Sequence, residues 1–321
     1  MRITRLIPLL AALCCAQAMA QGGAFPDRPL KVVVPFAAGG NVDIVARIVA
    51  TALSEDLRQN VVVENRAGAN AIIGGEFVAR AAPDGYTLLF GTAETHAINP
   101  HLYRKMGHDP VTDLPSVGIV DTFPFALVVN PKLPVASLKE FVEHAKKQPG
   151  KLNFASWGVG STSQIAFEQL KQQTGIDLVH VPFNGAAPAI TAVAAGDVEA
   201  FMVPLSVAAP QAAAGRIRLL AVTSTRRDAS APELPTATEQ GVPLVIGGWH
   251  VLAVPKGTPP EVMARLNRAL NAVNGRPDIQ EALSKRGVVA VTSTPQQAQE
   301  MVRAEWQRWG QVVSGAGIKA E

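Results

Sequence analysis

Apolar and polar residues alternate along the chain in blocks that predict a strand followed by a helix, repeated many times. Residues 31–36 form an almost continuous apolar run, which is typical of a strand buried in a parallel sheet. In the segment that follows, Val45, Val49, Leu53 and Leu57 recur at every fourth position and predict the apolar face of a helix. Further runs predict strands at residues 61–64, 87–90, 125–129, 152–155, 178–181, 200–203, 219–223 and 250–254.

Several helix starts are predicted by a hydroxyl residue followed three positions later by Glu or Gln. In this capping box the hydroxyl accepts from the first helical turn and the acid or amide reaches back to the cap. The pairs are Ser137 with Glu140, Thr236 with Glu239, Thr258 with Glu261 and Thr294 with Gln297. Regular alternation of strands and helices predicts the α/β class with a mostly parallel sheet.

Two places along the chain predict crossings between two lobes. One lies at residues 123–131 and the other in the loop at residues 226–235, and about 100 residues with their own strand–helix series lie between them. We therefore expect residues 21–124 and 227–321 to form a first lobe and residues 125–226 to form a second lobe. Two lobes joined by two crossings enclose a cleft and share a hinge.

The first twenty residues have the pattern of a secretory signal peptide. Arg2 and Arg5 precede an apolar stretch, and Ala18 and Ala20 place small residues before a cut at Gln21. The apolar stretch is shorter than the roughly 20 residues that span a bilayer. A lipoprotein is disfavoured because no small residue precedes either cysteine, and an N-terminal core helix is the other alternative. We expect residues 1–20 to be a signal peptide and the mature chain to reach the periplasm.

Charge and cysteine content exclude several kinds of protein. The 29 basic and 26 acidic residues give a net charge of +3, which is too small for a nucleic-acid-binding footprint. The two cysteines, Cys14 and Cys15, both lie in the predicted leader. The mature chain therefore has no disulfide, cysteine-ligated metal or cysteine nucleophile. No histidine has metal-ligand spacing, and we expect neither a metal nor a cofactor.

Glycine-rich or polar loops follow four of the predicted strands. Ligands of open α/β sheets bind beyond the carboxyl ends of strands, where helix N-termini offer unpaired N–H groups to an anion. The loops are residues 35–43, 91–93, 156–164 and 182–185. Each could equally be an ordinary turn from strand to helix, with Asn41 as the cap of the first helix and Ser161 as the cap of the second.

Signatures of common enzymes and nucleotide-binding proteins are missing from these loops. The first loop is neither a Walker loop nor a Gly-x-Gly-x-x-Gly fingerprint, and no Gly-x-Ser-x-Gly elbow occurs. A secreted α/β hydrolase that uses Ser156 or Ser161 is therefore a weak alternative. We expect a protein that is not an enzyme and has no catalytic residues.

Several short motifs together resemble one protein family. They are residues 25–29 (FPDRP), 34–40 (VPFAAGG), 63–69 (VENRAGA), 82–89 (APDGYTLL), 149–153 (PGKLN) and 220–224 (LAVTS). In this order the sequence resembles the extracytoplasmic solute-binding receptors of tripartite tricarboxylate transporters, the Bug-type receptors, over about residues 24–318.

The resemblance implies a monomeric, two-lobed Venus-flytrap protein of type II-like topology. It implies a small ligand, such as a carboxylate, held between the lobes, with the membrane permease subunits of the transporter as partners. A periplasmic sensor for a two-component kinase is an alternative role for the same fold. Position by position, the implied ligand-binding residues are Phe36, Ala37, Gly39, Gly40, Thr92, Ala93, Ser156, Gly158, Gly160, Ser161, Thr162, Asn184, Gly185 and Pro204.

Three departures from the family pattern narrow the expected ligand. Gln164 and Asn184 stand where family members often have His and Lys, and Val203 and Pro204 stand where an Asp–Asn pair is common. Without an acid at residue 203 we expect no amino acid ligand. Without a lysine at residue 184 we expect a mono- or neutral-headed ligand rather than a highly charged tricarboxylate.

Overall fold

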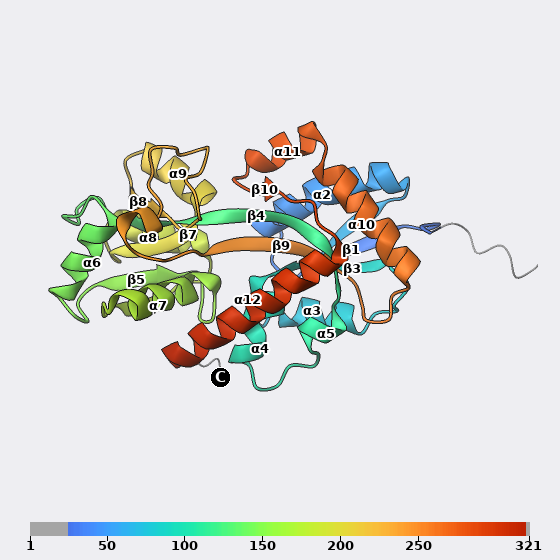
Figure 1. Cartoon of the computed structure of the whole chain (residues 1–321), viewed down its shortest axis with the longest axis horizontal. Helices are drawn as coiled ribbons and strands as arrows, with labels where there is room; N and C mark the ends of the chain where they lie inside the picture. Colours follow the sequence, from blue (N-terminus) through green and yellow to red (C-terminus); the bar gives the residue numbers. More distant parts are fainter. Residues whose placement is uncertain (1–24, 319–321) are drawn as a thin grey trace, which may run out of the picture.

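A 14-residue strand, β4 (Ser116–Val129), passes through both halves of the molecule (Figure 1). The structure is a computed structural model and describes residues 25–318; the predicted signal peptide, residues 1–20, lies outside these residues. Residues 116–124 of β4 pair with β9 (Gly247–Ala253), and residues 125–129 pair with β7 (Ala200–Pro204) and β8 (Arg218–Val222). The chain therefore forms two α/β lobes that share one continuous strand.

The sheet of the first lobe has the order β2-β1-β3-β9-β4. The strands β1 (Leu30–Val34), β2 (Val61–Asn65) and β3 (Thr87–Thr92) are parallel, and β9 is antiparallel to β3. The short strand β10 (Val289–Ala290) pairs with β4 as well. The other elements of this lobe are α2 (Asn41–Leu57), α3 (Ile72–Ala79), η1 (Glu94–Ile98), α4 (Asn99–Leu102), α5 (Pro110–Asp113), α10 (Pro260–Asn274), α11 (Pro277–Ser284) and α12 (Pro295–Ala316).

The sheet of the second lobe repeats this arrangement. Its strands β5 (Asn153–Ser156), β6 (Val179–Pro182) and β7 are parallel, and β4 runs antiparallel between β7 and β8, which gives the order β6-β5-β7-β4-β8. The other elements are α6 (Leu138–Lys146), α7 (Thr162–Thr174), α8 (Ala186–Ala195), α9 (Leu205–Ala213) and η2 (Thr238–Gln240). In each lobe the second-to-last strand of this order runs antiparallel to both neighbours: β9 in the first lobe and β4 in the second. This arrangement confirms the predicted two-lobed, type II-like fold.

One apolar core continues beneath both lobes. It includes Trp309 of α12, Ala97 of η1 and Phe167 of α7, none of which is exposed to solvent. Each lobe has a second core of its own on the opposite face of its sheet, under α2, α10 and α11 in the first lobe and under α8 and α9 in the second. Burial of these apolar faces supplies most of the stability of the helices. None of the helices within residues 25–318 is long and apolar enough to cross a membrane.

The helix-start predictions have mixed outcomes. The capping box of Thr294 and Gln297 is confirmed, and Ser137 accepts a hydrogen bond from the Glu140 N–H. The prediction for Thr258 is wrong, because its hydroxyl donates to the Pro255 carbonyl and Pro259 is the N-cap of α10. The predicted strands all occur, with bounds within a few residues, but the first nine residues of β4 were not predicted.

The segment between β8 and β9 stays close to the second lobe for most of its length. The Ala237 N–H donates to the Val222 carbonyl, and the Ile246 N–H donates to the Thr223 carbonyl, both at 2.8 Å. The Gln240 side chain also joins this segment to Leu220 and to the start of α6 at Leu138. The predicted boundary between the lobes at residues 226 and 227 stays a prediction. We propose that the chain returns to the first lobe later, at the start of β9.

Gly74 allows α3 to pack closely on β1. A Cβ atom at this position would lie 2.6 Å from the Pro35 Cβ and 2.9 Å from its Cα, and backbone cannot easily move away. We expect Gly74→Ala to lower the free energy of unfolding by about 1–3 kcal/mol in urea denaturation. Gly75→Ala is the control, since its Cβ would meet only side-chain atoms of His108, at 3.0 Å, and no backbone. Equal losses from both variants would contradict this explanation.

Candidate ligand-binding site between the lobes

The carboxyl ends of the parallel strands in the two lobes face one another. Gly160, which follows β5, packs against the end of α4: a Cβ on Gly160 would lie 2.4 Å from the Leu102 Cδ1. On another side, Gly287 packs equally closely on Ser206, which follows β7. The loops after β3 and β5 therefore meet between the lobes. The parallel pairing places the loops after β1 and β2 at the same edge of the first sheet, and those after β6 and β7 at the same edge of the second, where sheets of this kind bind ligands.

The loop after β1 is held by a buried carboxylate. Asp43 accepts hydrogen bonds from the Gly39 N–H at 2.9 Å, from Arg47 at 3.0 Å and from the Asn65 side chain at 2.9 Å. The hydrogen bond from Arg47 is the main cause that lowers the pKa of Asp43 to about 2. The Asn65 side chain also donates to the Phe36 carbonyl. The loop backbone is thus fixed before any ligand arrives.

The helix that follows this loop has an open N-terminus. Its N-cap is Gly40, not Asn41 as expected, and no side chain caps it. Residues 37–40 are exposed, and Gly39 has a φ of +82°, which glycine adopts without strain. The first N–H groups of α2 consequently point toward solvent with the positive end of the helix dipole, a favourable place for an anion.

The N-terminus of the matching helix in the second lobe is already occupied by a carboxylate. One oxygen of Glu94, just after β3, accepts hydrogen bonds from the N–H and hydroxyl of Thr162 in α7. The other oxygen accepts a hydrogen bond of 2.8 Å from the Thr92 hydroxyl. Glu94 is only 7% exposed. This residue was not predicted. It joins the two lobes through Thr162 and is held in its own lobe by Thr92, two residues that were expected to bind ligand.

The hydroxyls of the loop after β5 have partners within the protein. Ser156 and Ser161 both donate to the Gly158 carbonyl, at 3.0 and 2.6 Å. Ser161 also caps α7 by accepting from the Gln164 N–H. Gly158 has a φ of +147° and its position has open space around it. This loop therefore presents backbone groups rather than free hydroxyls.

The remaining predicted residues lie at helix starts or in the core. Gly185 and Pro204 are the N-caps of α8 and α9, and neither helix has a side-chain cap. Asn184 is exposed beside the start of α8. Ala93 is buried in the apolar core that the two lobes share. The structure thus brings the predicted loops to one region, but their ligand contacts stay a prediction.

Ser156 and His180 form a close pair that bears on the hydrolase alternative. The Ser156 Oγ lies 2.6 Å from the His180 Nε2, and burial together with the charge of Lys171 lowers the pKa of His180 to about 4. No carboxylate of the described residues hydrogen-bonds to this histidine, so the third member of a triad is missing there.

Within residues 25–318 no group of His, Cys, Asp and Glu could hold a metal ion.

His96, two residues after Glu94, is a buried histidine whose protonation is expected to lower the stability of the protein in acid. Burial, and then the charge of His108, lowers its pKa from 6.5 to about 4. The unfolded chain therefore takes up the proton first, and stability present above pH 6.5 is lost as the pH falls toward 4. We expect this one group to remove about 3 kcal/mol over that range. In urea denaturation from pH 7 to 4, His96→Gln should show a flatter profile; a profile as steep as the wild type's would contradict the assignment.

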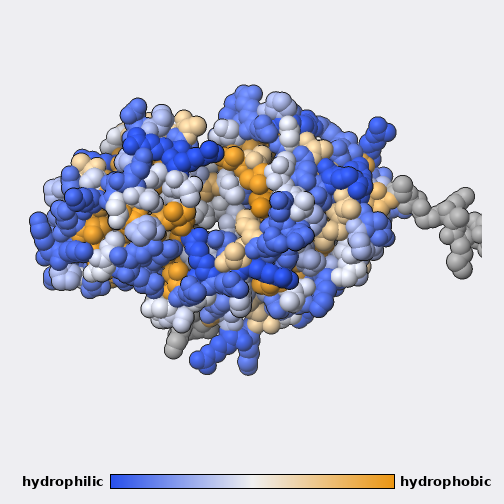
Figure 2. All heavy atoms as spheres, viewed as in Figure 1, coloured by the Kyte–Doolittle hydropathy of each residue, from blue (hydrophilic) through white to orange (hydrophobic). Residues whose placement is uncertain are grey.

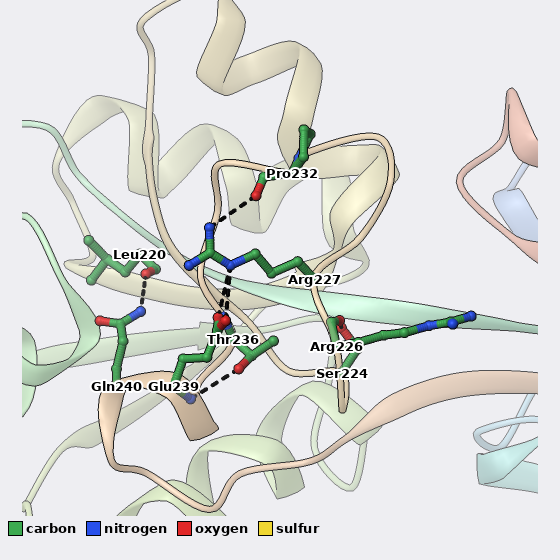
Figure 3. A network of polar contacts seen from close by, with 8 residues as sticks. All are labelled: Leu220, Ser224, Arg226, Arg227, Pro232, Thr236, Glu239 and Gln240. Carbon is green, nitrogen blue, oxygen red and sulfur yellow. Dashed lines mark hydrogen bonds and ion pairs between the residues drawn. The ribbon is translucent and has the colours of Figure 1, made fainter.

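A separate groove of about 870 Å³ lies between the lobes beside β4. Figure 2 shows a hollow with hydrophobic surface between the two halves of the molecule. Phe123, Leu205 and Val289 contribute to the lining, but none of the predicted ligand-binding residues does. On one wall, Arg227 is bound to Glu239 and to the Pro232 carbonyl, whereas the Arg226 side chain extends away from this network (Figure 3).

Comparisons with known proteins agree with this geometry. Residues 45–318 match the model of the tripartite tricarboxylate transporter family receptor. The structure of Rpa4515 from R. palustris with adipate has 36% sequence identity and a TM-score of 0.84, and the match covers 92% of this chain and 99% of that one.

Two further solved structures are similar over nearly their whole length. The periplasmic binding protein BugD is 34% identical with a TM-score of 0.80, over 92% of this chain and 100% of that one. MatC from Rhodopseudomonas palustris with bound malate is 32% identical with a TM-score of 0.80, over 90% of this chain and 100% of MatC. These relatives are solute-binding receptors rather than enzymes. This chain belongs to the receptor family of the tripartite tricarboxylate transporters.

Proposed function

We propose that the protein captures a small organic acid between its lobes in the periplasm and delivers it to the permease subunits of a tripartite transporter. The observation that carries this proposal is the N-terminus of α2 at Gly40, which no side chain caps and whose loop, at the carboxyl end of β1, is fixed by Asp43. An anion bound there gains contacts from the second lobe only when the lobes close, so it shifts the population toward the closed form.

A dicarboxylate is the ligand class that we favour. Rpa4515 and MatC, both similar to this chain throughout, were solved with adipate and malate. In this chain the site includes the carboxylate of Glu94, which disfavours a third negative charge on the ligand. The first backbone N–H groups of α2, α8 and α9, which follow the N-caps Gly40, Gly185 and Pro204, are donors for the ligand oxygens, and Asn184 adds an exposed amide. We further propose that the receptor acts as a monomer after cleavage near Ala20.

A thermal-shift screen of the mature chain tests this function. The panel contains acetate, malate, adipate, aspartate and citrate, and native mass spectrometry of freshly purified protein looks for a retained acid. We expect a dicarboxylate to raise the free energy of unfolding by about 2.7 kcal/mol at 100 times its dissociation constant. Stabilisation by aspartate or citrate alone would contradict the proposed ligand class, and no stabilisation by any acid would contradict the function.

A further inference from the structure

A histidine and an aspartate form a buried pair on the strands that join the lobes. The His250 Nδ1 on β9 lies 2.9 Å from both carboxylate oxygens of Asp121 on β4. His250 is 1% exposed and Asp121 is not exposed at all. No other hydrogen bond to the Asp121 side chain occurs within residues 25–318. A buried charge without further partners must be balanced by the group that it contacts.

An ionised Asp121 would determine the roles of the atoms in this pair. An ionised carboxylate only accepts hydrogen bonds, so the His250 Nδ1 carries a proton and donates it to Asp121. Both Asp121 carboxylate oxygens contact Nδ1, so the His250 Nε2 is the atom of the pair that can form a hydrogen bond with a further group. A second proton on Nε2 would make the ring a cation and would neutralise Asp121 within the sheet.

The ring is held in a position next to the candidate site. His250 is the register partner of Thr92 at the end of β3, so their side chains leave the same face of the sheet. The rings of Phe90 and Phe123 flank the imidazole, with centroids at 5.0 and 5.2 Å. Because aromatic rings occupy both sides, the imidazole has little freedom to turn away from this position.

Among the described residues, the His250 Nε2 has no hydrogen-bond partner, and it is not fully buried. It makes no hydrogen bond within the described residues, and it is not among the buried unpartnered atoms, which do include the Nε2 of His96. The small exposed area of His250 therefore includes this atom. The carboxylates of Glu94 and Asp121 lie near the end of β3, so a negatively charged ligand needs a positive group here.

We propose that His250, kept as an imidazolium by Asp121, donates a hydrogen bond from Nε2 to a carboxylate of the ligand. This proposal rests on the proposed function and deepens it, because it assigns a charged ligand-binding residue on the strand that connects the lobes. Asp121 is then a positioning residue, which sets the charge and the orientation of the ring without touching the ligand.

The protonation state can be measured without any ligand. Long-range ¹⁵N–¹H spectra at pH 7, with the His250 signals assigned from His250→Asn, report which ring nitrogens carry protons. We expect both nitrogens of His250 to be protonated in the wild type and only one in Asp121→Asn, where the hydrogen bond remains but the charge is removed. A neutral ring in the wild type would overturn the proposal.

Binding of adipate and malate, measured by calorimetry, tests the ligand contact. We expect His250→Gln and Asp121→Asn to weaken binding of the dicarboxylate by about 10- to 100-fold, the loss of a charged hydrogen bond. If His250→Gln alone fails to fold, the double variant His250→Gln with Asp121→Asn replaces it in the test, because its neutral Gln–Asn pair can keep a buried hydrogen bond. His144→Gln, on α6 and hydrogen-bonded to Gln148, is the matched control and should bind normally.

The outcomes separate this proposal from the proposed function. If the wild type binds a dicarboxylate and the folded His250 and Asp121 variants bind it equally well, only the role of His250 is overturned. If the wild type binds neither acid and no other carboxylate of the panel, the function is contradicted and this inference with it. Adipate monomethyl ester, which has lost one of the two carboxylates, gives a further check. We expect the difference in affinity between the wild type and His250→Gln to be smaller for this ester than for adipate.

Discussion

Gly40→Leu is expected to weaken carboxylate binding by at least about 100-fold while leaving the fold stable. The loss corresponds to about 2.7 kcal/mol or more of binding free energy. Gly40 is the N-cap of α2, and a ligand oxygen must come within about 3 Å of the first N–H groups to accept their hydrogen bonds. A leucine side chain at this position covers these donors, and no other part of the loop can replace them.

The same position tolerates a Cβ atom, so that binding and stability can be separated. Gly40 has a φ of −74°, and an added Cβ would meet only the Ala37 carbonyl oxygen, at 3.6 Å. Gly40→Ala should therefore bind nearly as well as the wild type, and both variants should unfold within about 0.5 kcal/mol of it in urea. If Gly40→Leu keeps the wild-type affinity in calorimetry, the assignment of the anion site to α2 is wrong.

Glu94→Ala is expected to lower the free energy of unfolding by about 3 kcal/mol and to separate the lobes. The substitution removes the acceptor of three hydrogen bonds, from Thr92 and from the hydroxyl and N–H of Thr162. Hydrogen bonds to a charged group are each worth about 1.5–3 kcal/mol, and water restores part of this when the lobes open. Urea denaturation gives the stability, and small-angle scattering should show a larger radius of gyration.

Glu94→Gln is the matched control for this variant. A glutamine can still accept from Thr162 through its oxygen and donate to the Thr92 hydroxyl through its amide. We expect it to keep the radius of gyration of the wild type and to lose less than half as much stability. If the alanine variant matches the wild type in both measurements, Glu94 does not hold the lobes together.

Local patterns in the sequence predicted the loops of the site but not their partners. The strand ends before Phe36, Ser156 and Asn184 are visible because an apolar run stops at a glycine-rich or polar turn. Glu94 and His250 carry no such signal: each acts through a residue of a distant strand or helix. Their roles depend on strand register and lobe packing, which a single sequence does not reveal.

The lobe boundary has a similar physical explanation. Proline and polar residues around Arg226 predict a loop, which we interpret as a crossing between lobes. Residues further along this segment contact the second lobe, where Thr236 and Glu239 exchange hydrogen bonds and Ala237 pairs with Val222, so the exact boundary stays a prediction. The first half of β4 escaped prediction because Gly118, Asp121 and Thr122 interrupt its apolar run.

The carboxylate of Glu94 at the start of α7 makes the two lobes unequal toward a ligand. In strand order α2 and α7 are equivalent helices, each following the central parallel strand of its lobe. At the start of α7 the acid comes from the other lobe, whereas at the start of α2 it is Asp43 of the helix's own first turn, which is bound by Arg47 and Asn65. If the proposed diacid binds at α2, the carboxylate of Glu94 repels its second charged end from the start of α7, so we expect an asymmetric solute to bind in one orientation.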